Sequence, residues 1–230
     1  MDGGGQLMTT EITPVEAYRL GPEDVPADGV DWQPEADRVA LLLHDMQEFF
    51  LRPFDLQAPP ATDLLRNTVE LRTRCVGLDI PVFYTAQPGS MTKQERGLLA
   101  AFWGPGMRAS AEDREVIAPL RPASGDRVLT KWRYSAFQRS PLLESLRDAG
   151  RDQLIIAGVY AHIGCLMTAV DAFSNDIQAF LVADAVADFS LADHRLALDY
   201  AARCCAATPT TASVLASLTR SATSSSADSR

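Results

Sequence analysis

The fold is decided by two stretches, RVALLLHDMQEFF at residues 38–50 and QLIIAGVYAHIGC at residues 153–165. Each contains an unbroken apolar run, which is typical of a strand buried on both faces of a parallel sheet. The first run stops at His44 and Asp45, and the second stops at Tyr160. Ligands of open parallel α/β sheets bind at the carboxyl ends of the strands. The two stretches therefore predict a small enzyme with a pocket at that edge of its sheet.

The rest of the chain alternates apolar runs with amphipathic helical periodicity, which is the pattern of repeated β-α-β units. The segment SPLLESLRDAG (140–150) carries clear helix signals, with Ser140 as the expected N-cap, Pro141 in the first turn and Gly150 as the stop. The sequence predicts strands at 38–44, 81–87, 126–131, 153–159, within 178–190 and at 205–209, and helices at 61–78, 140–150, 164–176, 191–205 and 210–219.

Composition divides the chain into three parts. Residues 1–37 are rich in Gly, Pro, Asp and Glu and are expected to form an extended arm that packs on a single α/β domain at 38–219. Residues 220–230 are Ser-rich without an apolar anchor, so they are expected to be disordered. A long connection runs from about residue 88 to 126, and connections of that length usually carry function or an interface. No G-x-G-x-x-G turn follows the first strand, so a dinucleotide site is not supported.

Charge and hydropathy restrict the partners. With 21 Lys and Arg against 30 Asp and Glu, the net charge is -9, which disfavours nucleic acid and anionic membranes as partners because both need clustered cations. The mean hydropathy is -0.05, and no apolar run approaches the length of a bilayer span. The start, MDGGGQLMTTEITP, lacks the regions of a signal peptide, and the 4 cysteines show no CxxC spacing. We therefore expect a cytoplasmic protein with free thiols.

Charged residues at predicted strand ends are candidates for catalysis and binding. Asp45 follows five apolar residues, where a carboxyl group can keep its proton near neutral pH and act as a general acid; alternatively, it is a helix N-cap or a salt-bridged structural residue. Lys131 can hold substrate anions beside that carboxylate or be a solvated lysine. Arg96, Arg133 and Arg139 can clamp carboxylates or lie on the surface.

Cys165 and the histidines allow two interpretations each. Cys165 lies at the predicted N-terminus of a helix, where the helix dipole favours a nucleophilic thiolate, but it can equally be a buried packing residue. His44 and His162 adjoin the decisive turns without metal-ligand spacing, so they are expected to make structural hydrogen bonds. His194 is expected to be solvated on its helix. No metal is predicted.

Six motifs occur together in one order: HDMQ (44–47), YTAQPG (84–89), FWGPGMR (102–108), TKWRYSAF (130–137), GVYAHIGC (158–165) and NDIQAFLVADAVADFS (175–190). Over about residues 38–206 they resemble the isochorismatase family of the cysteine-hydrolase superfamily. The stretch at 86–110 is more similar to phenazine-pathway 2-amino-2-deoxyisochorismate hydrolases than to siderophore isochorismatases. The resemblance implies a three-layer, Rossmann-like α/β fold: a six-stranded parallel sheet with helices on both faces. It also implies an isochorismatase-like domain at 38–219, a homodimer, and neither metal nor cofactor.

The resemblance further implies a reaction and its residues. Enzymes of this branch hydrolyse a vinyl ether and split pyruvate from a cyclohexadiene acid. Asp45 corresponds by motif to the family's general acid and Lys131 to its conserved lysine. A cis peptide between Val159 and Tyr160 is also implied. Pocket-lining positions of the family correspond here to Phe49, Gln87, Arg96, Trp103, Tyr134, Tyr160 and Gly164.

A mechanism follows from the chemistry of a vinyl ether. Its terminal methylene carbon is protonated, water adds to the resulting cation, and the hemiketal collapses to pyruvate and a ring alcohol. Asp45 is the expected proton donor. Because the substrate is a dicarboxylate, Arg96 and Lys131 are expected to hold its carboxylates, with the backbone N–H groups of Gly164 and Cys165 as a further anion site.

Three alternatives stay open at this point. The ring can carry an amino group or a hydroxyl group, and the hydroxyl form would make the chain an isochorismatase releasing 2,3-dihydro-2,3-dihydroxybenzoate. Cys165 aligns with the nucleophile of related amidases, so a Cys165-dependent amidase is a rival enzyme, although vinyl-ether hydrolysis needs no thiol. A non-catalytic binding protein would leave the acid, the lysine and the pocket motifs unexplained.

Overall fold

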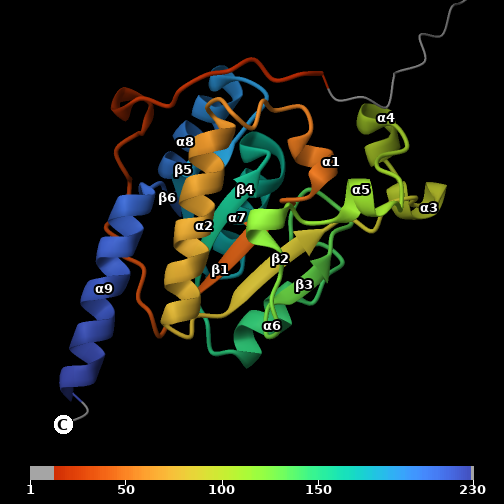
Figure 1. The fold of residues 1–230 in the computed structure, drawn as a ribbon. Coiled ribbons are helices and arrows are strands. Elements are labelled where there is room, and N and C mark those ends of the chain that lie inside the picture. The colour runs from red at the N-terminus through yellow and green to blue at the C-terminus, as the bar shows by residue number, and fades with distance from the viewer. Residues whose placement is uncertain (1–12, 229–230) are drawn as a thin grey trace, which may run out of the picture.

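The computed structural model describes residues 13–228, and a six-stranded sheet forms its centre (Figure 1). All strand pairs are parallel, and the strands lie in the order β3-β2-β1-β4-β5-β6. This confirms the α/β fold class. The strands are β1 (Val39–His44), β2 (Val82–Ala86), β3 (Arg127–Thr130), β4 (Gln153–Val159), β5 (Gln178–Ala187) and β6 (Ala206–Ala207).

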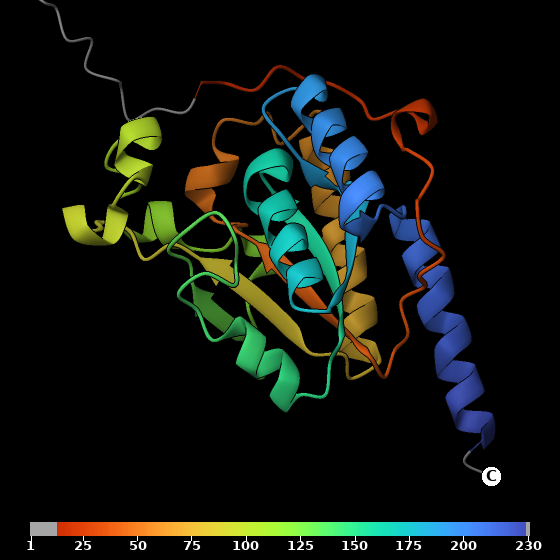
Figure 2. The same ribbon diagram turned by 180° about the vertical axis from the view of Figure 1, so that it is seen from behind.

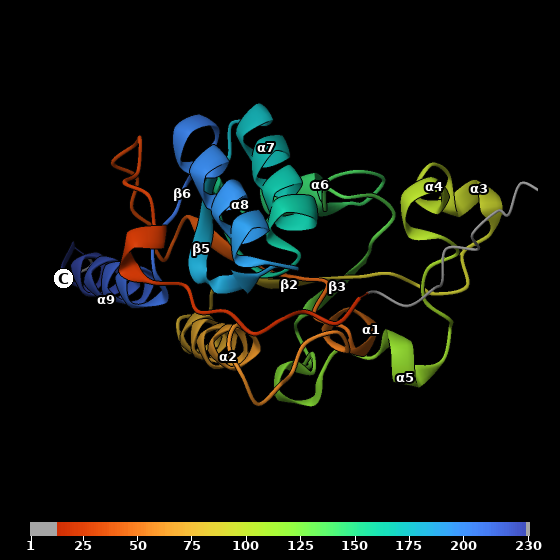
Figure 3. The ribbon, with the colours of Figure 1, turned by 90° about the horizontal axis from the view of Figure 1, so that it is seen from above.

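Helices cover both faces of the sheet, as Figure 3 shows most plainly. On one face lie α2 (Ala61–Gly77) and α9 (Thr211–Asp228). On the other lie α6 (Leu142–Asp148), α7 (Leu166–Ser174) and α8 (Leu191–Cys204). Within residues 13–228, no helix combines the length and the apolar character needed to cross a bilayer.

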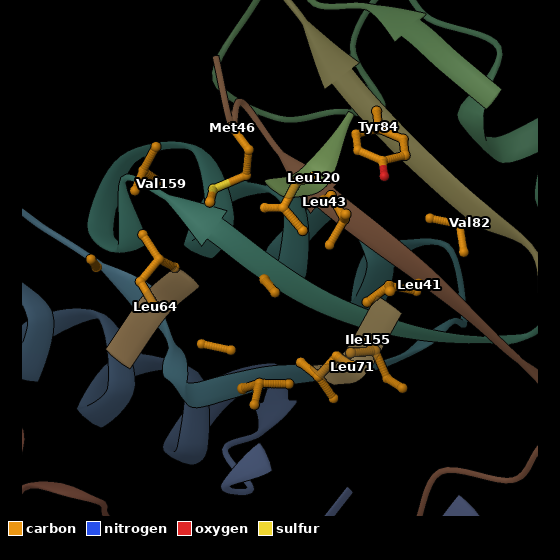
Figure 4. Packing of buried hydrophobic residues seen from close by; sticks show 14 of the residues in the cluster. Leu41, Leu43, Met46, Leu64, Leu71, Val82, Tyr84, Leu120, Ile155 and Val159 are labelled. Carbon is orange, nitrogen blue, oxygen red and sulfur yellow. The ribbon is translucent and has the colours of Figure 1, made fainter. Parts of the chain in front are cut away.

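The apolar runs of the strands explain the two-sided burial. Successive side chains of a strand point to opposite faces. Leu41 and Leu43 accordingly join one core cluster with Leu64 of α2 (Figure 4), while Leu42 joins the other cluster with Leu146 of α6. Both sets are fully buried, so β1 is held by apolar burial on both faces.

At the carboxyl end of β4, the peptide geometry agrees with the sequence prediction, whereas the start of the following helix does not. The Val159–Tyr160 peptide bond is cis, which confirms the expectation. The helix predicted from residue 164, however, is preceded by a π-helical turn at Ala161–Cys165. There the Tyr160 carbonyl accepts the N–H groups of Ile163, Gly164 and Cys165 at 3.2, 3.1 and 3.3 Å.

The long connection between β2 and β3 contains several short helices and no long one. In Figures 1 and 2 its first part stands out from the sheet. Its helices are α3 (Lys93–Arg96), α4 (Leu99–Trp103), α5 (Ala111–Arg114) and a 3₁₀ turn at Ala118–Leu120. Helix α5 contacts α1 (Glu48–Leu51).

The described part of the arm is extended, with one 3₁₀ turn at Pro22–Asp24, and it packs on the domain. Val15 donates its N–H to the Pro53 carbonyl at 2.8 Å, and Gly29 donates to the Ala202 carbonyl at 3.2 Å. Residues 1–12 of the predicted arm lie outside the described residues.

The end of α9 and the start of α6 also differ from the sequence prediction. Helix α9 continues to Asp228. It therefore occupies most of the tail at 220–230, which was expected to be disordered. Just before this tail, the Thr219 hydroxyl donates to the Leu215 carbonyl, four residues earlier in the same helix, at 2.8 Å. The N-cap of helix α6 is Pro141 instead of Ser140. The Ser140 hydroxyl nevertheless accepts the Leu142 N–H at 3.2 Å. Gly150 adopts a φ of 64° directly after that helix, as a helix stop requires.

Candidate active site

A cavity opens at the carboxyl ends of the strands, where the sequence predicted a pocket. Apolar and aromatic side chains line it together with a few polar and charged groups, which is usual for a small-molecule site. Every residue predicted to line the pocket does so except Cys165: the lining includes Asp45, Phe49, Gln87, Arg96, Trp103, Lys131, Tyr134, Tyr160 and Gly164. The sequence did not single out Phe50, Leu99, Gly106, Val159, Ile163 and Phe189, which also line it.

Asp45 and Lys131 form a buried ion pair in this cavity. Lys131 Nζ lies 2.9 Å from Asp45 Oδ2, and both side chains are less than a tenth exposed. Thr85, at the end of β2, donates its hydroxyl to Asp45 Oδ1 at 2.6 Å and accepts the Asp45 N–H at 3.1 Å. Asp45 is therefore no helix cap and Lys131 is not solvated. Thr85 was missed because nothing in the sequence distinguishes it from other strand residues.

His44 lies behind this pair and supports the chain around it. Its Nδ1 lies 2.9 Å from the Val159 carbonyl, which requires the proton on Nδ1, while Nε2 has no hydrogen-bond partner among the described residues. Burial, reinforced by the Lys131 ammonium, lowers the pKa of His44 to about 4. A Cβ at Gly164 would overlap the His44 ring, so Gly164 permits this close packing.

Arg96 supplies a positive charge to the cavity wall. Its guanidinium donates to the Gly104 carbonyl at 2.9 Å, to Gln87 Oε1 at 3.2 Å and to the Trp103 carbonyl at 3.2 Å. Burial lowers the pKa of Arg96. Within residues 13–228, no carboxylate pairs with it, so the charge can serve an anionic ligand.

The other two arginines considered as clamps differ from each other. Arg133 lines the cavity and donates to the Glu95 carbonyl at 2.8 Å, so it also holds α3 in place. Arg139 is not among the residues that line the cavity.

Aromatic rings form one wall of the cavity. Phe189, directly after β5, stacks on Tyr160 with centroids 4.0 Å apart and on Trp103 at 6.0 Å. Trp103 Nε1 donates to the Tyr134 hydroxyl at 2.7 Å, and Tyr160 donates its hydroxyl to the Phe50 carbonyl at 2.7 Å. An aromatic residue after a predicted strand end was the signal that could have identified Phe189.

Asp188 fixes the backbone that carries this wall. Its carboxylate accepts the N–H groups of His162 and Phe189 at 2.6 and 2.8 Å and contacts His162 Nδ1 at 2.8 Å. The hydrogen bond to Asp188 raises the pKa of His162. From the arm, the Tyr18 hydroxyl accepts the Asp188 N–H at 2.8 Å. It also lies 3.1 Å from Nδ1 of His194.

One expectation about the histidines needs correction. His194 is 1% exposed instead of solvated, because Tyr18 and the Ala183 carbonyl, 3.0 Å from its Nε2, enclose it. His162, Asp188 and Asp193 bring potential ligand atoms within 4.8 Å of one another, a cluster that sequence spacing did not reveal. The Asp188 oxygens already accept the hydrogen bonds described above, and these hydrogen bonds explain why the three side chains lie close together.

For Cys165, the structure agrees with the second of the two interpretations, that of a buried packing residue. Its side chain is fully buried outside the cavity lining, and burial raises the pKa of the Cys165 thiol instead of lowering it. The predicted anion site is wrong as well, since the N–H groups of Gly164 and Cys165 both donate to the Tyr160 carbonyl. The π-helical turn explains the missing anion site, because it directs both N–H groups to that one carbonyl.

Comparison with known proteins agrees with this geometry. The family model of the Isochorismatase domain matches residues 39–213. Phenazine biosynthesis protein PhzD1 of Pseudomonas aeruginosa is 55% identical over 89% of this chain and 98% of its own length. Isochorismatase of Bacillus subtilis is 52% identical over 89% of this chain and 66% of its own length.

A solved structure supports the fold. The cysteine hydrolase from Pseudomonas syringae pv. phaseolicola 1448A superposes with a TM-score of 0.77 at 23% identity, over 84% of this chain and 97% of that one. At this identity the likeness concerns the fold alone. Taken with the matching domain and the relatives of about half identity, the chain belongs to the isochorismatase family and is an isochorismatase-type hydrolase.

Proposed function

We propose that the chain hydrolyses the enolpyruvyl vinyl ether of 2-amino-2-deoxyisochorismate, releasing pyruvate and trans-2,3-dihydro-3-hydroxyanthranilate in antibiotic biosynthesis. The name of the 55% identical relative, a phenazine biosynthesis protein, supports this substrate. The observation that carries the proposal is the buried Asp45–Lys131 pair, 2.9 Å apart, in an aromatic cavity with the uncompensated charge of Arg96.

Asp45 is the proton donor in this proposal. The proton that Lys131 and Asp45 share across their 2.9 Å contact first moves from the Lys131 ammonium to the Asp45 carboxylate. It then moves from the Asp45 carboxyl group to the terminal methylene carbon of the vinyl ether, which leaves an oxocarbenium ion on the substrate. The resulting carboxylate lies beside that cation and stabilises it. Lys131, 2.9 Å from Oδ2, hydrogen-bonds the carboxylate and offers a route for resupplying its proton.

Substrate anions are held by the far side of the cavity. Arg96 and Gln87 are hydrogen-bonded to each other at 3.2 Å, and together they offer a cation and an amide to the enolpyruvyl carboxylate. The wall of Phe189, Tyr160 and Trp103 covers the ring and limits water around the cation. Water then adds to the oxocarbenium carbon, and the hemiketal breaks its bond to the ring oxygen to release pyruvate.

The isochorismate form of the substrate is the second candidate, because the Bacillus subtilis isochorismatase is 52% identical. The amidase alternative has less support. A thiol nucleophile must reach its substrate as a thiolate, whereas Cys165 is buried outside the cavity lining and burial raises its pKa.

A coupled assay for pyruvate, run with both substrates, tests the proposal. We expect pyruvate from both, with the larger kcat/KM for 2-amino-2-deoxyisochorismate. A larger kcat/KM for isochorismate would establish the isochorismatase alternative. Pyruvate from neither substrate would reject vinyl-ether hydrolysis.

We also propose that the protein is a homodimer in the cytoplasm. Cys75, Cys165, Cys204 and Cys205 are free, which fits a reducing cytoplasm. A homodimer fits the apolar surface formed by Leu98, the N-cap of α4, and Phe102 within α4, which are 87% and 71% exposed. Light scattering after size-exclusion chromatography would show twice the 25.0 kDa chain mass if the dimer forms.

A further inference from the structure

We propose that Gln47, which contacts none of the reacting atoms, is a positioning residue that fastens the substrate-binding lobe. The lobe is defined as residues 88–113, the part of the long connection that carries Arg96 and Trp103. This inference rests on the proposed function for its kinetic test, because it assigns the lobe a share of substrate binding.

The Gln47 side chain joins both ends of the lobe. It is fully buried. Its Oε1 accepts the Gln87 N–H at 2.8 Å, and its Nε2 donates to the Gln87 carbonyl at 3.0 Å. Nε2 also donates to the Arg114 carbonyl at 2.8 Å. The Gln47 amide therefore binds both backbone groups of Gln87, just before the lobe, and the carbonyl of Arg114, just after it.

Backbone contacts also join the segment at Gln47 to the chain just after the lobe. Gln47 forms an isolated antiparallel bridge with Val116, and Glu48 donates its N–H to the Glu115 carbonyl at 2.9 Å. Since Gln47 is two residues after Asp45, the proton donor and the anchor of the lobe share one short segment. The position of Arg96 relative to Asp45 is therefore set through Gln47 and Gln87.

The chemistry at this point requires an amide. Both Nε2 hydrogens are used by carbonyls, and Oε1 faces an N–H, so the reversed orientation of the amide would place donor against donor. A glutamate has the same shape but no hydrogen to donate. In Gln47→Glu, the Gln87 and Arg114 carbonyls would each face a carboxylate oxygen, which is unfavourable in a buried site. The lobe should detach from β1 at both ends.

The chain contains a matched control in Gln153. This glutamine is also fully buried and, like Gln47, makes three hydrogen bonds to nitrogen or oxygen atoms. Its Oε1 accepts the Glu35 N–H at 2.8 Å, and its Nε2 donates to the Gln33 carbonyl at 3.0 Å and to Gln178 Oε1 at 2.8 Å. It begins β4, at the opposite edge of the sheet from the cavity. Gln153→Glu therefore reproduces the buried substitution without touching the lobe.

The kinetic test compares Gln47→Glu with Gln153→Glu in the pyruvate assay. We expect Gln47→Glu to raise KM about tenfold, as the loss of two hydrogen bonds would, while kcat changes less than about threefold. Gln153→Glu should lower the melting temperature comparably but leave KM unchanged. Equal KM values in two folded variants would overturn the inference, as would a loss confined to kcat.

Limited trypsin digestion gives a readout that needs no substrate. Lys93 and Arg108 lie within the lobe and are exposed, so detachment of the lobe should speed cleavage there in Gln47→Glu but not in Gln153→Glu. Equal cleavage rates in the lobe for both variants would overturn the inference. If the wild-type chain releases no pyruvate, the proposed function fails, while the digestion still decides the role of Gln47. If Gln47→Glu does not fold, the same two measurements on Gln47→Met decide it, because methionine also lacks the amide hydrogens.

Discussion

At the scale of single residues, the site depends on how a few buried polar groups are partnered. Asp45 adopts a φ of 52°, in the left-handed region that Asp tolerates better than most residues. In this conformation its carboxylate meets both Lys131 and Thr85. The sequence could identify the acid and the lysine from their strand-end positions. It could not identify Thr85, since that role depends on the register between β1 and β2.

Cys165→Ala should keep most of the pyruvate release. The thiol is buried beside the cavity and does not line it, and the proposed reaction needs no covalent intermediate. We expect a kcat within about threefold of wild type and a stability loss of about 1 kcal/mol for the small cavity. Initial rates and thermal melting measure both quantities. A folded variant without activity, or a covalent adduct in the mass spectrum of wild type, would support the amidase alternative.

His44 should make the fold sensitive to acid. Its folded pKa of about 4 lies below its ordinary value of 6.5, so between these values the unfolded chain binds a proton that the folded chain does not. Its contribution to stability is thus complete above pH 6.5 and is lost as the pH falls toward 4. The difference corresponds to about 3 kcal/mol.

The test of this linkage is urea unfolding from pH 7 to pH 4. Compared with wild type, His44→Asn should show a flatter decline in the free energy of unfolding over that range, because Asn can donate to the Val159 carbonyl but does not titrate. Parallel declines in the two proteins would contradict the assignment.

At the scale of elements, the turn after β4 shows what sequence patterns leave out. Helical periodicity predicted a helix from residue 164, and the structure has α7 from Leu166. The π-helical turn before it arises because one carbonyl, that of Tyr160, accepts three N–H groups. No local propensity encodes that arrangement, and it removes the anion site that the helix N-terminus was expected to provide.

The same turn should be intolerant of a single methyl group. Gly164→Ala would place a Cβ against the His44 ring, which is fixed by its hydrogen bond to the Val159 carbonyl. We expect a destabilisation of about 1–3 kcal/mol, measured by urea unfolding, together with reduced turnover. Gly77→Ala is the control, because a Cβ there meets nothing within 4 Å. Equal stability of the two variants would show that the turn can relax.

The arm should stabilise the aromatic wall through one hydroxyl. Tyr18→Phe removes the acceptor of the Asp188 N–H and leaves that N–H without its partner, at a cost of about 1–3 kcal/mol. Because Asp188 also holds the Phe189 N–H, KM should rise with little change in kcat. Melting curves and the pyruvate assay report the two effects. Unchanged stability would mean that the arm contributes nothing to the pocket.

At the scale of the whole molecule, parallel topology gathers the site. Asp45, Gln87, Lys131, Tyr160 and Phe189 follow β1, β2, β3, β4 and β5 in turn, and all five line one cavity. This convergence could be predicted because parallel strands end at a common edge. The attachment of the lobe by Gln47 could not be predicted, because the Gln47 side chain contacts Gln87, 40 positions away, and Arg114, 67 positions away.

The central claim, that Asp45 delivers the proton to the vinyl ether, is tested most directly by the single-turnover rate of Asp45→Asn. Asparagine keeps the shape of the side chain but has no acidic proton to give. We predict that substrate still binds, as quenching of tryptophan fluorescence would report, and that the rate of pyruvate formation falls by roughly 100-fold or more. A folded Asp45→Asn variant that keeps more than about a tenth of the wild-type rate would contradict it.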